Sequence, residues 1–174
     1  MKALHATLIS IALLSAVLLI AKSAESSPAA ATNNVDITAR GPFEYDLKTG
    51  RLHWSDHVVV DDPGSLHLTC EDLVAERSLT NRRIESIVAT SNVVITLFEG
   101  GVTSEARCGR AVYLAATDTF EFTQDNPVVS RLDSTSWADT IIFDRSTGKV
   151  HGRGNPRMKF NAAAISRTNL LGPK

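Results

Sequence analysis

The sequence predicts an all-β protein whose antiparallel strands roll or stack around an apolar interior. Three observations lead to this prediction. After residue 31 no segment has the apolar spacing of an amphipathic helix, alternating apolar and polar residues recur, and turn residues separate the alternating segments. The 174 residues suit one domain, and the 43% of apolar residues is enough for a core.

Residues 1–31 differ from the rest of the chain and are interpreted as an export signal. Lys2 supplies a basic start, residues 3–21 are mostly apolar, and small residues continue to Ala31. This order is typical of a cleaved secretory signal peptide, and a retained membrane anchor is the alternative. We therefore expect an exported protein with its β domain at residues 35–163 and a short tail at residues 164–174.

The charge balance excludes two classes of function. The formal net charge is −1, and cleavage after Ser23, which removes Lys2 and Lys22, leaves 16 basic against 19 acidic residues. Nucleic-acid binders and polybasic membrane-surface proteins carry an excess of positive charge. We expect neither kind of partner.

Alternation within the predicted strands defines one inward-facing set of apolar side chains, because successive residues of a strand point to opposite faces. From the residues alone, this face is either a packed core or a surface that binds an apolar ligand. Its members are Leu52, Trp54, Val58, Val60, Leu66, Leu68, Val93, Ile95, Leu97, Phe120, Phe122, Val128, Ile141, Phe143, Met158 and Phe160.

Turn sequences stand where these strands should end. The segments DDPG at residues 61–64 and EGG at residues 99–101 are typical turns. Residues 46–50 and 144–148 share the form Asp-x-x-Thr-Gly, in which the glycine suits a positive φ angle.

A weak internal repeat accompanies the turns. The segments WSDHVVV, ATSNVVI, FTQDNPVV and GRGNPRM align on His57, Asn92, Asn126 and Asn155, with spacings of 35, 34 and 29 residues. Each block reads as strand, turn, strand, and stacked units of this kind share one continuous core. Pro127, Pro156 and Arg157 near strand positions could discourage wrong pairing, or an end strand is left open for another protein to extend.

Residues with reactive side chains do not form a recognisable catalytic pattern. Cys70 and Cys108 either form a disulfide, which export permits, or remain two buried thiols. The histidines at positions 53, 57, 67 and 151 fall on polar strand positions, so we expect no metal site. With no nucleophile elbow and no glycine-rich phosphate loop, we expect neither an enzyme nor a cofactor.

Several of these segments resemble the LptA/OstA-like family of lipopolysaccharide-transport proteins. The resemblance runs from Ile37 to Phe160 and rests on the segments ITARGPFEYD, GRLHWSDHVVV, LHLTCEDLVA, IVATSNVVI, ARCGRAVY and FEFTQDNPV, in this order. The chain departs from the family pattern at Gln124-Asp125, where Thr-Gly is usual, and at His57, where Asn is common.

The resemblance implies an OstA-like β-jellyroll that acts in the periplasm as a lipopolysaccharide-binding protein. Acyl chains would travel along the apolar interior residues, and the chain would form part of a bridge between the inner and outer membranes. LptC-like and LptD-like partners, and further copies of this chain, would add at the terminal strands. Two alternatives stay open: a membrane-anchored LptC-like component, and an envelope adaptor without lipid cargo.

Overall fold

A computed structural model describes residues 34–161, and every regular element in this range is a β-strand. Within these residues there is no helix with the length and apolarity that crossing a membrane requires. The predicted signal segment, the last two residues of the predicted domain and the C-terminal tail lie outside the described residues.

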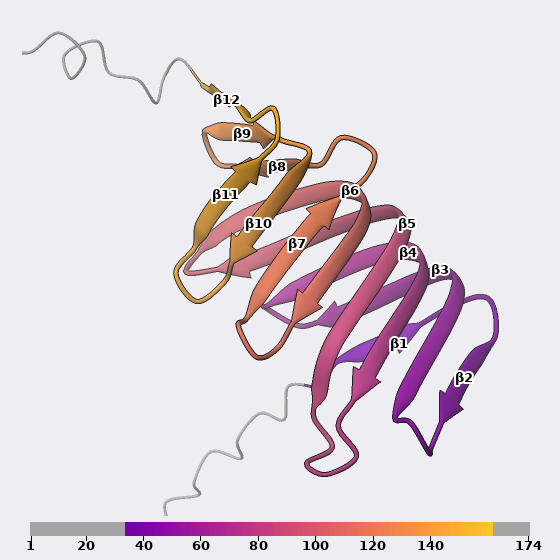
Figure 1. Ribbon diagram of the computed structural model, residues 1–174. Coiled ribbons are helices and arrows are strands. Elements are labelled where there is room, and N and C mark those ends of the chain that lie inside the picture. The colour runs from indigo at the N-terminus through magenta and orange to yellow at the C-terminus, as the bar shows by residue number, and fades with distance from the viewer. Residues whose placement is uncertain (1–33, 162–174) are drawn as a thin grey trace, which may run out of the picture. The chain divides into compact units, whose positions relative to one another are not determined.

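The described strands form one antiparallel sheet of twelve strands (Figure 1). Its main path runs β1-β3-β4-β5-β6-β7-β10-β11, while β2 pairs with β3, β8 pairs with β6 and β9, and β12 pairs with β9. The strands are β1 (Asp36–Thr38), β2 (Phe43–Asp46), β3 (Arg51–Asp62), β4 (Leu66–Arg77), β5 (Ile84–Glu99), β6 (Val102–Leu114), β7 (Thr119–Thr123), β8 (Val128–Arg131), β9 (Ser134–Trp137), β10 (Thr140–Asp144), β11 (Lys149–Arg153) and β12 (Arg157–Phe160).

The sheet folds back on itself because its long strands bend in the middle. One half of β3 pairs with β1 and the other half with β2, and β6 likewise pairs with β8 through one half and with β7 through the other. Two facing walls result. The first wall contains β1, β8, β9 and β12, the second wall contains β2, β7, β10 and β11, and β3 to β6 cross from one to the other.

The bends explain the internal repeat seen in the sequence. The φ angles of His57, Asn92, Asn126 and Asn155 are 51°, 54°, 53° and 48°. The first two residues stand at the bends of β3 and β5, and the last two stand at the bends between β7 and β8 and between β11 and β12. Asn, Asp and Gly tolerate this left-handed region better than other residues. The pairing register shifts at the bends of β3 and β5, as an inserted bulge requires.

The neighbouring strand must pass close to each of these bends. Gly109 of β6 lies against the bend between β7 and β8, where its N–H donates to the carbonyl of Gln124 at 3.1 Å. A Cβ atom added to Gly109 would lie 2.9 Å from the Cβ of Gln124. Glycine is therefore needed at this position because of the close approach of two bent strands.

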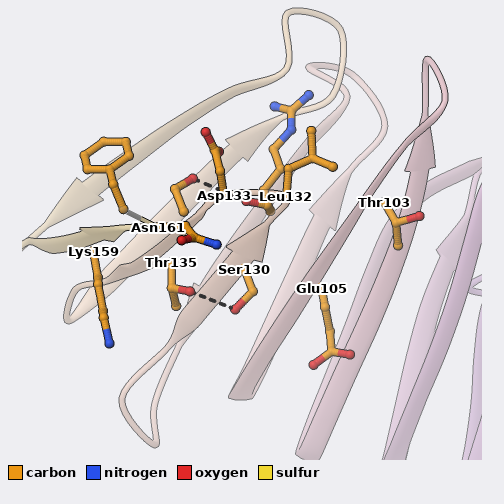
Figure 2. A pocket seen from close by; sticks show the side chains of 11 residues that line it. Thr103, Glu105, Ser130, Leu132, Asp133, Thr135, Lys159 and Asn161 are labelled. Atoms are coloured by element: carbon orange, nitrogen blue, oxygen red, sulfur yellow. Dashed lines mark hydrogen bonds between the residues drawn. The ribbon is translucent and has the colours of Figure 1, made fainter. Parts of the chain in front are cut away.

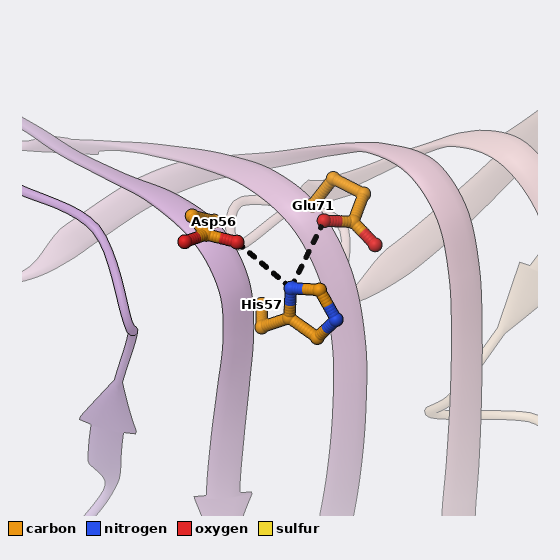
Figure 3. Close-up of side chains that lie close together, drawn as sticks. All are labelled: Asp56, His57 and Glu71. Atoms are coloured by element: carbon orange, nitrogen blue, oxygen red, sulfur yellow. Dashed lines mark hydrogen bonds and ion pairs between the residues drawn. The ribbon is translucent and has the colours of Figure 1, made fainter.

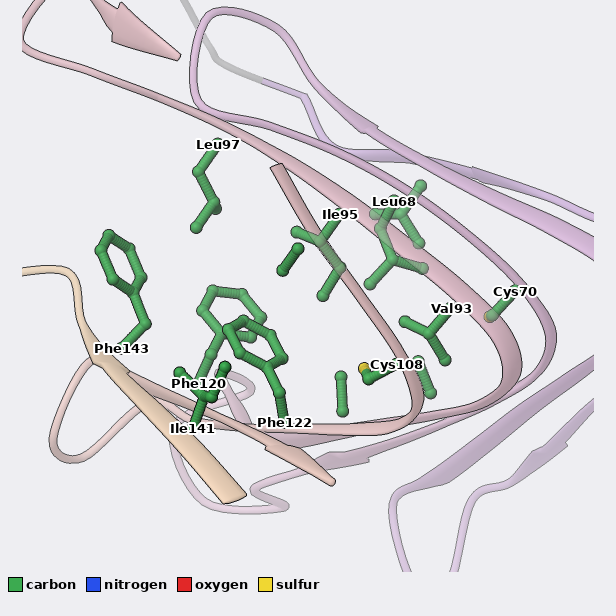
Figure 4. Packing of buried hydrophobic residues seen from close by; sticks show 14 of the residues in the cluster. Leu68, Cys70, Val93, Ile95, Leu97, Cys108, Phe120, Phe122, Ile141 and Phe143 are labelled. Carbon is green, nitrogen blue, oxygen red and sulfur yellow. The ribbon is translucent and has the colours of Figure 1, made fainter. Parts of the chain in front are cut away.

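Apolar side chains from both walls fill the space between them (Figure 4). In one row of the second wall, Phe122 is opposite Ala111 on one side and Ile141 on the other. Val58, Ile95, Phe122 and Ile141 are all 0% exposed, so the middle of the roll is a packed core.

The two ends of the roll remain open. Among the described strands, β1 and β2 pair only with β3, β11 pairs only with β10, and β12 pairs only with β9. Figure 1 shows β1 and β2 at one end of the sheet and β11 and β12 at the other. Each end therefore carries strand edges that another chain can extend.

Candidate functional site

Most of the apolar residues predicted to face inward do so. Those buried in the core are Val58, Val60, Leu68, Val93, Ile95, Leu97, Phe120, Phe122, Ile141 and Phe143. Leu52, Trp54 and Leu66 are half-buried and pack against them. The candidate site is thus an apolar interior that is shared by both walls.

The prediction that Val128 faces inward was wrong. It is opposite Arg107, whereas its neighbour Val129 is buried opposite Ala106. The bend before β8 contains three consecutive left-handed residues, Gln124 to Asn126, where the bends of β3 and β5 contain two. The extra residue shifts the alternation by one position, and the side chain of Val129 rather than Val128 enters the core.

The sequence reasoning also missed interior residues of β4. Leu73 and Ala75 are buried, although their odd positions differ from those of Leu68 and Cys70 earlier in the same strand. The register of β4 against β5 shifts between Thr69 and Asp72, without a left-handed residue to mark the bend. The sequence of β4 contains no turn residue from which this change of face could be predicted.

Met158 and Phe160 reach the interior face only at its open end. Met158 is opposite Ser136, which in turn is opposite the core residue Val129. Because β12 has no further strand beside it among the described residues, Met158 and Phe160 remain 51% and 49% exposed. The interior face therefore continues into an apolar mouth at the C-terminal end.

The N-terminal end has a similar apolar mouth. Phe43 of β2 is opposite Trp54, and the centroids of the two rings are 5.0 Å apart. Phe43 is largely exposed, although it belongs to the same face as the core. It was absent from the predicted set, because β2 is too short for its alternation to stand out.

A small cavity lies just inside the C-terminal mouth. Its volume is about 160 Å³, and Ser136, Ile141, Val150 and Met158 line it from both walls. Pockets for small molecules usually measure roughly 300–1,000 Å³. An acyl chain would therefore enter this interior only if the packed side chains or the two walls move apart.

A larger hollow lies at the edge of the first wall, beside β12 and the loop between β8 and β9 (Figure 2). It measures about 610 Å³. Leu132 and Phe160 line it, as do polar side chains such as Glu105, Ser130, Thr135 and Lys159. These polar residues alternate with the inward-facing set along their strands. Polar and apolar side chains therefore share this hollow, unlike the apolar interior.

The two cysteines do not form the disulfide that the sequence left open. Both thiols are free and buried. Cys70 lies on β4 and Cys108 on β6, and β5 runs between them. Two strand spacings separate the Cα atoms by about 9–10 Å, beyond the roughly 7 Å that a disulfide spans. The alternative of two buried thiols is confirmed.

Burial gives these thiols a testable property. It raises the pKa of Cys70 to about 12 and that of Cys108 to about 11, from an ordinary value of 9.0. In the unfolded chain the thiols ionise first, so their contribution to stability is complete below about pH 9 and is lost as the pH rises to about 11–12. We expect the free energy of unfolding, measured with urea, to fall across this range.

The matched control is the Cys70→Ala, Cys108→Ala double variant. Its unfolding free energy should fall less steeply with pH above about pH 9 than that of the native chain. Burial also raises the pKa of Tyr113, so a Tyr113→Phe variant accounts for the phenol. Equal slopes for the native chain and the double cysteine variant would contradict the assignment.

Histidines on the outer face pair with carboxylates. His53 Nε2 lies 2.7 Å from Asp72 Oδ2, and His67 Nδ1 lies 2.8 Å from Asp61 Oδ1. All four side chains are partly exposed, so these pairs add little to stability.

A third group brings together three potential metal ligands that the sequence reasoning did not connect (Figure 3). Asp56, His57 and Glu71 offer ligand atoms that lie within 4.8 Å of one another. His57 Nδ1 is already 2.8 Å from Asp56 Oδ1 and 3.4 Å from Glu71 Oε2. Ion pairing at an exposed bend accounts for this arrangement without a metal.

Comparison with known proteins identifies the fold. No protein-family model matches the chain, and no curated protein matches it either. The chain is similar to the crystal structure of LptH from Pseudomonas aeruginosa, described as the LptA homologous periplasmic component of the conserved lipopolysaccharide transport device. The TM-score is 0.66 at 16% sequence identity, over 74% of this chain and 96% of that one. The predicted OstA-like β-jellyroll is thereby confirmed as the fold.

Proposed function

We propose that this chain is a periplasmic lipopolysaccharide-binding protein of the LptA/OstA-like family and forms part of a bridge between the inner and outer membranes. One observation carries the proposal: a continuous apolar face runs through the roll and emerges at both open ends, at Phe43 and at Met158 and Phe160. The likeness to a lipopolysaccharide-transport component supports it.

The interior suits a cargo that must move along it. Burial of apolar surface contributes about 25 cal/mol per Å², so an acyl chain gains from contact with many side chains along the roll. A row of similar apolar residues binds without holding the chain at one point. The sugars of the glycolipid would stay outside, where the strand faces are polar.

The open strand edges suit end-to-end assembly. An incoming strand can pair with β1 or β2 at one end, or with β11 or β12 at the other. We expect an LptC-like partner at the N-terminal edge, an LptD-like partner at the C-terminal edge, and further copies of this chain between them. This polarity follows the family resemblance alone.

The second candidate is an envelope adaptor that uses the strand edges but carries no lipid. The packing of the interior favours it, because the central side chains have no exposed surface. If residues 1–31 remain attached, the lipopolysaccharide-binding protein of the first candidate would be a membrane-anchored, LptC-like component. Neither candidate involves catalysis.

Crosslinking in cells that make lipopolysaccharide separates the two candidates. A photo-crosslinking amino acid replaces Ile95 or Phe122 in the interior, and in the control it replaces Glu121, the exposed neighbour of Phe122. The lipid carrier is expected to trap lipopolysaccharide at both interior positions and much less at Glu121. Equal trapping at all three positions, or protein products alone, would reject the lipid cargo.

A further inference from the structure

On the side of the roll opposite the bends, none of the described strands connects the two walls, but side chains from loops do. There the hairpin loops of the first wall meet those of the second. Arg145, in the loop between β10 and β11, contacts Glu99 at the end of β5 and Ser65 before β4. Its Nε donates to Glu99 Oε1 at 2.9 Å, and its Nη2 donates to Ser65 Oγ at 3.0 Å.

The same arginine is also tied to its own wall. Its Nη1 lies 3.6 Å from Asp118 Oδ1, and its backbone N–H donates to the Asp118 carbonyl at 3.0 Å. Asp118 Oδ1 in turn accepts a hydrogen bond from the Tyr113 hydroxyl at 3.0 Å. We call Arg145, Glu99, Ser65 and Asp118 the clasp.

The clasp is more buried than the other Arg–carboxylate pair of the described residues. The side chains of Arg145 and Glu99 are 21% and 24% exposed, against 62% and 42% for Arg107 and Glu105. Burial opposes the charge of Arg145, but the hydrogen bond to Glu99 and the charge of Asp118 outweigh it, so its pKa is raised. A partly desolvated, charge-assisted contact of this kind holds two elements in register.

A second contact ties the same loop to the first wall. Arg131 Nη1, at the end of β8, donates to the Gly148 carbonyl at 3.1 Å. Both ends of the loop between β10 and β11 are therefore attached to the first wall on the side opposite the bends.

The turn that carries Arg145 is one of the two Asp-x-x-Thr-Gly turns of the sequence. Asp144 Oδ1 accepts hydrogen bonds from the Ser146 hydroxyl at 2.7 Å and from the Thr147 N–H at 3.0 Å, which shapes the loop. In the other turn, the residue after Asp46 is Leu47, which is 73% exposed. Both turns share the Asp-x-x-Thr-Gly form, but only the turn at residues 144–148 has an arginine after its aspartate.

The clasp lies next to two apolar side chains of the core. Glu99 stands two residues after the core residue Leu97, and Arg145 stands two residues after the core residue Phe143. Figure 4 shows Leu97 and Phe143 away from the bend, and Cys70 close to it. With the clasp in place, Leu97 and Phe143 are only 2% and 1% exposed.

We propose that the clasp is a lateral gate: it holds the two walls together, and its release admits acyl chains from the side. This inference rests on the proposed lipid cargo. Arg145 and Glu99 are still about a fifth exposed, so each can exchange its partner for water and the contact is reversible, as a disulfide would not be.

The test uses thiol labelling of the full chain. A Leu97→Cys reporter beneath the clasp is combined with Cys70→Ala, and Cys108 near the bend serves as the internal comparison. Adding Arg145→Ala is expected to raise the labelling rate at position 97 on the order of tenfold, as loss of a charge-assisted hydrogen bond implies. Arg145→Lys should give a smaller increase, and Arg107→Ala, which removes the exposed pair, should give none.

Comparison of the two thiols separates opening of the gate from unfolding. Side opening labels position 97 before Cys108 and depends weakly on low urea concentrations, whereas global unfolding labels both at one rate. Unchanged labelling in Arg145→Ala, or equal rates at both thiols, would overturn the gate.

A second experiment, with lipopolysaccharide, tests the gate and the lipid cargo separately. With the crosslinking amino acid in place of Phe122, Arg145→Ala should raise the yield of trapped lipopolysaccharide relative to Arg107→Ala, because release of the clasp admits acyl chains. An unchanged yield together with faster labelling would overturn the gate's role in lipid entry. No trapped lipopolysaccharide in any variant would instead overturn the lipid cargo, although the clasp itself could still be seen to open.

Discussion

Replacing Phe122 with alanine is expected to lower the free energy of unfolding by about 3–5 kcal/mol. The ring is 0% exposed and lies 5.8 Å from that of Phe120, with 14° between the two planes. Its neighbour in the sheet, Ala111, is too small to fill the space that the substitution would create. Urea unfolding followed by circular dichroism measures the loss.

The matched control is Phe98→Ala. Phe98 is 43% exposed and alternates with the core residue Leu97, so its loss should cost about 0.5 kcal/mol or less. Phe122→Leu keeps most of the volume and should cost under about 1.5 kcal/mol. Similar losses for Phe122→Ala and Phe98→Ala would show that the interior is loosely packed, contrary to the structure.

The second large effect is expected on assembly. Met158 and Phe160 extend the interior face to the C-terminal mouth, where the next chain would cover them. A Met158→Asp, Phe160→Asp double variant would place two carboxylates in that contact without partners. Burial of a carboxylate without a partner costs several kcal/mol, so we expect end-to-end association to weaken by about a hundredfold or more.

Sedimentation velocity over a range of protein concentrations measures this effect. Leu132→Asp is the matched control, because Leu132 is highly exposed in the loop between β8 and β9 and belongs to neither strand edge. Its association should match that of the native chain. If the double variant still associates normally, the C-terminal mouth does not form the contact between copies.

The unfolding of the double variant is the accompanying check. Since both side chains are half-exposed within a single chain, its free energy of unfolding should change far less than that of Phe122→Ala. A large loss of stability would assign Met158 and Phe160 to the core of the single chain instead.

The sequence by itself determined the class of the fold and the position of the four bends that the repeat marks. Alternation is a local property of each strand, so the inward faces of β3, β5, β7 and β10 could be predicted from residue parity alone. The asparagines of the repeat could be found because left-handed backbone favours a few residue types. These signals need no knowledge of which strands become neighbours.

Only the tertiary structure decided how the pattern continues after each bend. One extra left-handed residue places Val129 in the core instead of Val128. At the bend of β4, where no left-handed residue marks it, the inward face changes parity and Leu73 enters the core. The strand order separates Cys70 from Cys108, and the folding of the sheet brings Arg145 to Glu99, 46 residues away. Parity after a bulge and contacts between distant loops depend on pairing register and on how the walls meet, which no short segment of sequence encodes.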